Sequence, residues 1–212
     1  DGAIQKLQAE LNSKQTKVDE IAKSIFENRK KTAPILIEKI RAILAQLGMV
    51  EANFQIEINH TDSYYPKGKD EVILLFSANK GTSFLFLKKV ASGGEMSRIM
   101  LAIKAILANY SKLPTIIFDE IDTGVSGEIA IKMGEIMKEM SATMQVFAIT
   151  HLPQIAAKGS SHYKVSKRNQ GDTTISELNL LTQEERIQQI AEMLSGKDIT
   201  DSALQHAKAL LN

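Results

Sequence analysis

The 212-residue chain contains no cysteine and no tryptophan, and it has only four prolines. The absence of cysteine excludes disulfide bonds and cysteine-based metal sites, and it is compatible with a reducing cytoplasm. No uninterrupted apolar run approaches the roughly 20 residues that span a bilayer. The first residues, Asp1-Gly2, include no methionine and do not begin a signal peptide. We therefore expect no membrane segment, and we expect a region of a longer protein.

An excess of one charge is also lacking. The 26 lysines and arginines nearly balance 25 aspartates and glutamates, which gives a net charge of +1. The chain therefore has no basic field that would by itself indicate nucleic-acid binding. Hydrophobic residues make up 43% and charged residues 24% of the chain, as in ordinary globular proteins. This composition excludes a disordered or fibrous chain, and the length allows a core in one or two domains.

Residues 1–48 predict a long helix that kinks or restarts near Pro34, which lacks a backbone donor and crowds the preceding turn. Apolar residues recur at alternating spacings of three and four, as on a helix whose seam faces a second helix. The many charges and few aromatics favour a coiled-coil arm, while an ordinary amphipathic helix remains the alternative. The seam consists of Ile4, Leu7, Leu11, Val18, Ile21 and Ile25, then Leu36, Ile40, Ile43 and Leu47.

Residues 49–212 predict an α/β lobe that begins with short hairpin strands. From Glu95 onward, helices alternate with apolar strands, which predicts parallel strands buried by helices on both faces. A polar, turn-rich stretch at 167–172 precedes two helices within 184–211, which are broken near Gly196. The predicted strands are residues 54–59, 72–76, 84–87, 115–118 and 145–149.

A pair of glycines opens the first helix of this lobe. Ser92-Gly93-Gly94-Glu95 stands directly before an apolar helical pattern that starts at Ile99. Glycines let backbone amides approach a phosphate closely, and a helix amino terminus directs unpaired N–H groups at an anion. The motif therefore predicts a phosphate-binding loop, although a turn with an ordinary helix cap has the same sequence.

Two acids end the apolar strand that precedes them. Asp119 and Glu120 stand at its carboxyl end, the edge of an open α/β sheet where ligands bind. One carboxylate at this edge can hold the water shell of a magnesium ion, and the other can orient and polarise an attacking water. We predict these roles for Asp119 and Glu120 respectively, with a strand end capped by solvated acids as the alternative.

Two further residues complete the set. Asp122 begins a turn just past the acids, where it can reach across an interface, and it precedes a helix whose methionines we expect in the core. His151 directly follows the second apolar strand, at the same sheet edge as Asp119 and Glu120. A lone histidine is usually structural. This one lies within reach of a terminal phosphate at that edge.

The order of these motifs resembles that of an ABC-type ATPase head, with its signature loop, acidic strand end, aspartate-containing turn and switch histidine. The wider text resembles the RecN family of bacterial DNA-repair ATPases, most densely from about residue 72 to residue 165. The segments that carry the resemblance are Lys89-Val90-Ala91-Ser92-Gly93-Gly94-Glu95-Met96-Ser97-Arg98, Ile117-Phe118-Asp119-Glu120-Ile121-Asp122 and Thr150-His151-Leu152-Pro153-Gln154-Ile155-Ala156.

The resemblance implies that the chain is half of an ATP-hydrolysing head that works as a dimer. In such heads, Ser92, Gly93, Gly94 and Glu95 would form the signature loop, which completes the ATP site of a second head. Asp122 would be the aspartate that contacts the dimer partner. The implied cofactors are ATP and Mg²⁺.

The resemblance also implies that Asp119 is the magnesium-associated acid, Glu120 the catalytic carboxylate and His151 the phosphate-sensing switch. One part of the family pattern is absent, because no Gly-x-x-x-x-Gly-Lys-[Ser/Thr] occurs. Gly68-Lys69 and Gly196-Lys197 are each followed by aspartate, which cannot supply the hydroxyl that ligates magnesium. In the family this loop lies upstream of the arm. We therefore expect this chain alone to be inactive.

Action in DNA double-strand break repair and recombination, DNA binding and a nucleoid-associated location in the bacterial cytoplasm are likewise implied by the resemblance. The expected partners are a second head, an amino-terminal lobe that carries the missing loop, and DNA. One alternative is a non-enzymatic coiled-coil scaffold with a degenerate head, which the adjacent pair of acids disfavours. Another is the ATPase subunit of a membrane transporter, which the arm-like first segment disfavours.

Overall fold

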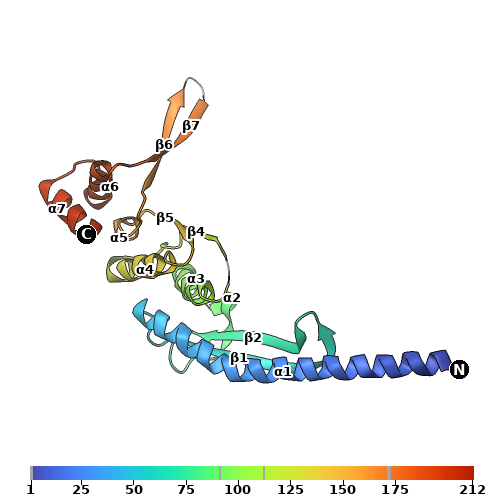
Figure 1. Ribbon diagram of the computed structural model, residues 1–212. Coiled ribbons are helices and arrows are strands. Elements are labelled where there is room, and N and C mark those ends of the chain that lie inside the picture. The colour runs from blue at the N-terminus through green and yellow to red at the C-terminus, as the bar shows by residue number, and fades with distance from the viewer. Residues whose placement is uncertain (1, 91, 112, 171–172) are drawn as a thin grey trace. The chain divides into compact units, whose positions relative to one another are not determined.

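The computed structural model describes residues 2–90, 92–111, 113–170 and 173–212, which form an α/β fold (Figure 1). The chain divides into two units. One contains residues 1–45 and 49–91, and the other contains residues 46–48 and 92–212. The predicted division into an arm at 1–48 and a lobe at 49–212 stays a prediction. In the structure, the first strands group with the arm helix.

One helix, α1 (Gly2–Gln46), forms the predicted arm. It continues through Pro34, so the predicted restart is wrong. Pro34 has no N–H to donate to the carbonyl one turn before it, but Pro34 is exposed, so water can bond that carbonyl. The turns that follow are stabilised by the buried side chains of Ile40 and Leu44. No described helix, α1 included, is long and apolar enough to cross a membrane. The exposed residues of the apolar seam are Ile4, Leu7, Leu11, Val18 and Ile21.

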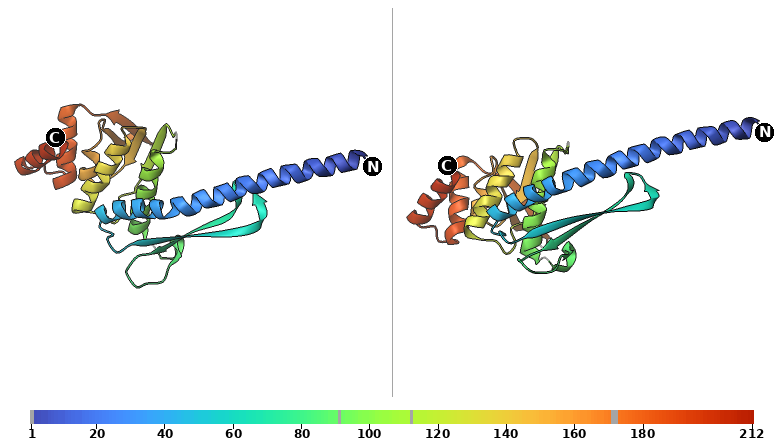
Figure 2. Two further views of the ribbon diagram at one scale, coloured as in Figure 1. Left: turned by 60° about the horizontal axis from the view of Figure 1, so that its bottom comes forward. Right: turned by 90° about the horizontal axis from the view of Figure 1, so that it is seen from below.

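The predicted hairpin strands form an antiparallel sheet in the order β1-β2-β3, which confirms that part of the sequence pattern. The first two strands are longer than predicted and run alongside α1 (Figure 2). Phe54 and Phe76 face each other across them, with ring centroids 5.1 Å apart, and both are buried. The bounds are β1 (Asn53–Tyr65), β2 (Gly68–Ser77), β3 (Leu85–Phe86) and α2 (Leu87–Val90).

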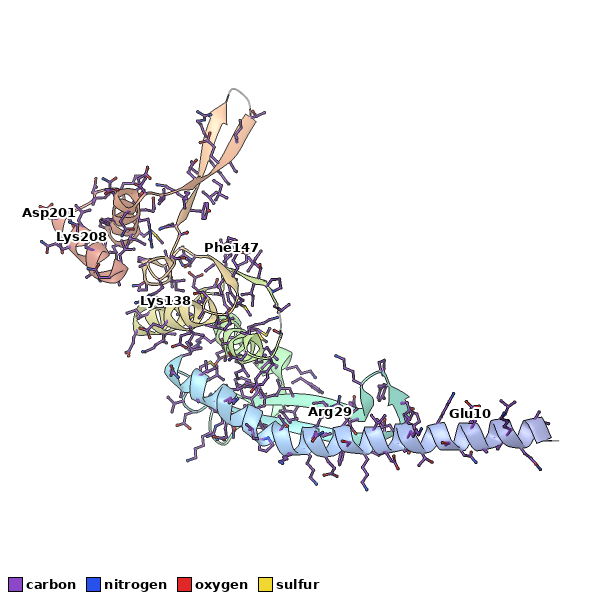
Figure 3. All side chains as sticks on the ribbon, in the orientation of Figure 1. Glu10, Arg29, Lys138, Phe147, Asp201 and Lys208 are labelled. Atoms are coloured by element: carbon purple, nitrogen blue, oxygen red, sulfur yellow. The ribbon has the colours of Figure 1, made fainter. Side chains whose placement is uncertain are left out.

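Side chains of α1 hold this hairpin. The Arg29 guanidinium, labelled in Figure 3, lies 3.0 Å from the carboxylate of Asp70 on β2 and also donates to the Lys67 carbonyl at 2.8 Å. Phe26 packs edge-on against the His60 ring at a centroid distance of 5.8 Å. The Asp70 side chain is fully buried. The hairpin is therefore fixed to the arm by a buried charge and by an aromatic contact.

The predicted alternation of helices and strands is confirmed in the second unit. The two strands β4 and β5 are parallel, and the intervening helix packs its methionines inward, with Met133 fully buried. Ile99 and Leu101 of the first helix are also fully buried. The bounds are α3 (Gly93–Ala108), β4 (Thr115–Asp119), α4 (Gly127–Met140), β5 (Gln145–Ile149) and α5 (Pro153–Ala156).

Only one face of the β4–β5 sheet is covered within the described residues. Phe118 is buried, whereas the neighbouring Ile117 is 64% exposed. On β5, Phe147 and Ile149 are 42% and 55% exposed, and Phe147 is labelled in Figure 3. Successive strand residues point to opposite faces, so these three apolar side chains belong to one face. The prediction of helices on both faces is therefore wrong for this chain alone.

The end of the chain contains a hairpin and a helix pair. The stretch predicted as a polar turn at 167–172 instead contributes residues 167–170 to a strand, while residues 171–172 lie outside the described ranges. The two predicted helices are confirmed, and Gly196 follows the first with a left-handed φ of 79°. Ile190 and Ala207 are fully buried between them. The bounds are β6 (Tyr163–Gln170), β7 (Thr173–Leu180), α6 (Gln183–Ser195) and α7 (Asp201–Leu211).

Candidate functional site

The serine-glycine motif caps helix α3. Ser92 is the N-cap, and its hydroxyl accepts a hydrogen bond from the Glu95 backbone N–H at 3.4 Å. The Ser92 N–H and hydroxyl each donate to the Glu95 carboxylate at 2.8 Å. This reciprocal capping box lowers the pKa of Glu95, chiefly through the backbone hydrogen bond from Ser92. The serine hydroxyl therefore points to its own helix, and Ala91, which precedes it, lies outside the described residues.

The two glycines of the motif have different surroundings. A Cβ atom added to Gly94 would lie 3.2 Å from the Thr123 carbonyl oxygen, closer than an ordinary contact. A Cβ atom added to Gly93 would meet nothing within 4 Å. Gly94 therefore permits the start of α3 to touch the turn that follows β4, while Gly93 leaves an open surface beside the helix amino terminus.

The acid pair lies at the carboxyl end of β4, as predicted. Asp119 is the last strand residue, and Glu120 follows with a left-handed φ of 47°, the only positive φ of a non-glycine residue in the described ranges. The Glu120 N–H donates to the Ile149 carbonyl of β5 at 3.1 Å. The Thr123 hydroxyl donates to the Glu120 carbonyl at 2.9 Å. Both acidic residues are exposed, so their carboxylates can reach a ligand at this edge.

The parallel register brings the histidine to the same edge. Asp119 lies opposite Ile149, the last residue of β5, and Thr150 and His151 follow directly. The sequence prediction that Asp119, Glu120 and His151 share one sheet edge is therefore met by the backbone. The His151 side chain is 70% exposed.

Asp122 lies in a different environment from the other acids, because it is fully buried. Its carboxylate accepts a hydrogen bond from the Thr150 hydroxyl and lies 3.5 Å from Nδ1 of His151. We did not single out Thr150 from the sequence as a functional residue. Its sequence signals are a hydroxyl side chain between a strand end and a histidine, and its place in a segment that carries the family resemblance.

The described residues contain no cluster of three or more histidine or acidic side chains that could hold a metal ion. Asp119 and Glu120 supply two exposed carboxylates at the sheet edge. Such a set fits Mg²⁺, which keeps several waters and is bound through one or two carboxylates together with substrate phosphates. It does not fit a metal that requires a closed cage of protein ligands.

The fold and the order of the motifs define the class of this chain. It resembles the Smc head domain with a coiled coil and joint of Pyrococcus yayanosii at a TM-score of 0.67 and 20% identity, covering 90% of this chain and 35% of that one. At this identity the likeness shows the fold alone. The fold is that of an ABC-type ATPase head lobe with an arm helix, as the sequence predicted.

Sequence comparison gives the family. The chain is 43% identical over 201 residues to the DNA repair protein RecN of Rickettsia conorii, and 37% identical over 205 residues to that of Deinococcus radiodurans. The matches cover 93% and 97% of this chain but 36% of each relative. No family model matches the chain. The region spanned by this chain therefore belongs to the RecN family, and it spans about a third of the relatives' length.

Proposed function

We propose that this chain is the carboxy-terminal half of a RecN-type ATPase head that acts in DNA double-strand break repair and recombination. The observation that carries the proposal is the shared edge of β4 and β5, where Asp119, Glu120 and His151 follow adjacent parallel strands. The capped amino terminus of α3 provides a second surface suited to an anion. A hydrolytic site for a nucleoside triphosphate needs both kinds of group.

We assign the hydrolytic roles to the exposed residues of the sheet edge. Glu120 orients and polarises the attacking water, and His151 contacts the terminal phosphate. Asp119 would hold Mg²⁺ through water, and the ion would supply charge neutralisation for phosphoryl transfer. The left-handed backbone of Glu120 supports its role, because a conformation that costs about 1–2 kcal/mol is retained mainly where it orients a functional group.

We assign the signature residues to a second head. Ser92, Gly93, Gly94 and Glu95 complete the ATP site of the partner, and Asp122 is the aspartate of the dimer-forming turn. The open space beside Gly93 supports this assignment, since a phosphate can approach the backbone amides there. The Ser92 hydroxyl must leave the Glu95 carboxylate, or share its hydrogen bond, when a phosphate binds.

The other half of each site comes from outside this chain. The apolar face that carries Ile117, Phe147 and Ile149 supports an additional lobe, because two parallel strands with a bare face do not make a stable sheet. That lobe carries the phosphate-binding loop missing here. We infer that the chain is inactive by itself, and that the whole protein works in the cytoplasm with DNA and a second head.

Substitution of Glu120 tests the catalytic assignment. In the full-length protein, Glu120→Gln is expected to lower the turnover of ATP by about a hundredfold or more while ATP binding is unchanged, because an amide cannot act as a base. Steady-state phosphate release and binding of a fluorescent ATP analogue measure the two quantities. Glu139→Gln, at an exposed acid of α4, is the matched control. Undiminished turnover in Glu120→Gln would remove this residue from the proposed role.

Substitution of Ser92 tests the assignment across the dimer. Ser92→Arg is expected to abolish ATP-driven dimerisation in sedimentation velocity, because a bulky cation occupies the surface meant for the partner's phosphate. Thr182→Arg is the matched control, because Thr182 and Glu185 form the same capping box at the start of α6. The control removes a helix cap without touching the proposed site. Equal dimerisation of the two variants would refute the assignment.

A further inference from the structure

The carboxylate of Asp122 is a buried charge at the functional edge. It has no exposed surface, and one of its oxygens, Oδ1, has no hydrogen-bond partner within the described part of the chain. Its other oxygen, Oδ2, accepts from the Thr150 hydroxyl. A carboxyl group is costly to bury without partners, so its retention requires nearby polar groups that meet it. The groups that meet it here belong to the segment that carries His151.

Thr150 connects this carboxylate to both sides of the histidine. Its hydroxyl donates to Oδ2 of Asp122 and accepts a hydrogen bond from the Leu152 N–H at 3.0 Å. The Thr150 hydroxyl therefore connects the residues on either side of His151, Thr150 and Leu152, to the Asp122 carboxylate. This arrangement fixes the backbone on either side of a side chain that is itself mostly exposed.

The ring of His151 also lies beside the same carboxylate. Its Nδ1 lies 3.5 Å from Oδ2 of Asp122. The partner of one ring nitrogen decides which nitrogen carries the proton and which direction the other nitrogen faces. With Nδ1 directed at the buried carboxylate, Nε2 is the nitrogen available to an external ligand.

The geometry points to Asp122 as a positioning residue that acts within its own chain. Through Thr150 and His151, it holds the imidazole with Nε2 turned toward the terminal phosphate of the nucleotide. This inference rests on the proposed ATPase function. It assigns the Asp122 side chain an internal role in place of the expected contact with a dimer partner. Complete burial of the side chain favours the internal role, since a contact across an interface requires exposed surface.

Turnover measurements on the full-length protein test the connection. Asp122→Ala and Thr150→Val are each expected to lower kcat by roughly tenfold or more, the size found when a group that orients a functional histidine is removed, with little change in KM. Thr150→Ser keeps the hydroxyl and is expected to restore most of kcat. In a His151→Ala background, Asp122→Ala is expected to cause no further loss.

Two results would overturn the inference. One is a Thr150→Val variant with the turnover of the unmodified protein. The other is a loss in Asp122→Ala that multiplies with that of His151→Ala and is accompanied by lost dimerisation, as a contact across the interface predicts. If His151→Ala itself keeps full turnover, the assigned role of His151 in the proposed function fails instead.

A spectroscopic measurement keeps the inference testable without activity. Long-range ¹H–¹⁵N correlations of ¹⁵N-histidine-labelled protein report the tautomer of His151, which His151→Ala assigns. At alkaline pH, where imidazole is neutral, we expect the proton on Nδ1 in the unmodified protein. Asp122→Asn, which keeps the volume of the side chain, is expected to return the ring toward the Nε2–H tautomer of free histidine. An unchanged tautomer in Asp122→Asn would contradict the proposal even if Asp122→Ala failed to fold.

Discussion

The ion pair between Arg29 and Asp70 predicts an unequal cost for removing its two partners. The Asp70 side chain is fully buried, whereas the Arg29 side chain is 28% exposed. Breaking a buried pair typically costs about 3–5 kcal/mol, because one charge is left without a partner in a poorly solvated place. Arg29→Met leaves the buried carboxylate with His60, at 3.3 Å, as its remaining charged partner among the described residues, so its cost should lie in this range. Asp70→Ala leaves a guanidinium that reaches water, so a smaller cost of about 1 kcal/mol is expected after discounting for screening.

Hydrogen exchange of the amides in β1 and β2, followed by mass spectrometry, measures the local free energy of opening for each variant. Exchange should accelerate more in Arg29→Met than in Asp70→Ala. Arg41→Met is the matched control, because the Arg41–Glu38 pair of the same helix is exposed on both sides and should change exchange little. The reasoning is refuted if the two hairpin variants exchange equally, or if Asp70→Ala exchanges faster.

Two further predictions concern the helix starts. Gly94→Ala should lower the thermal unfolding midpoint, because the new methyl lies 3.2 Å from the Thr123 carbonyl oxygen. Gly93→Ala, the control, should leave the midpoint unchanged. Equal midpoints of the two variants in calorimetry would contradict the contact. Hydrogen bonds from the N-cap residues lower the pKa of Glu95 and Glu185, so their stabilisation is present above the ordinary pKa of 4.5 and is lost as pH falls through the lowered values. Replacing both glutamates by glutamine should therefore flatten the fall in stability below pH 4.5, and an unchanged slope would exclude this cause.

Local sequence patterns predicted most of the elements because their signals lie within a few residues. The helix that begins at Gly93 starts with a capping box. The helix that ends at Ser195 is followed by Gly196, a glycine with a left-handed φ. The two parallel strands are short apolar runs of five residues. The placement of Asp119 and His151 at one sheet edge then followed from parallel pairing alone. These predictions needed no knowledge of the tertiary contacts.

The failures arise where distant residues or missing ones decide the structure. The arm helix was expected to kink or restart near Pro34, and the restart does not occur. The cost at Pro34 is one backbone bond on an exposed surface of a 45-residue helix. The bare sheet face at Ile117 and Phe147 could not be predicted, because apolar strands look the same whether or not their covering segment is present in the chain. The strand at 163–170 consists mostly of polar residues, and its composition resembles that of a turn.

The least predictable feature is the coupling of the acid pair to the histidine through the backbone. Glu120 adopts its left-handed conformation at a cost of about 1–2 kcal/mol, and three hydrogen bonds offset that cost: its N–H to Ile149, and its carbonyl to the N–H and hydroxyl of Thr123. The first bond connects to the strand before His151, and the others connect to the turn that holds Asp122. A shift of the Glu120 backbone therefore reaches both of these segments. The segments that carry Glu120, Asp122 and His151 should therefore shift together when a nucleotide binds, because backbone hydrogen bonds of Glu120 join them.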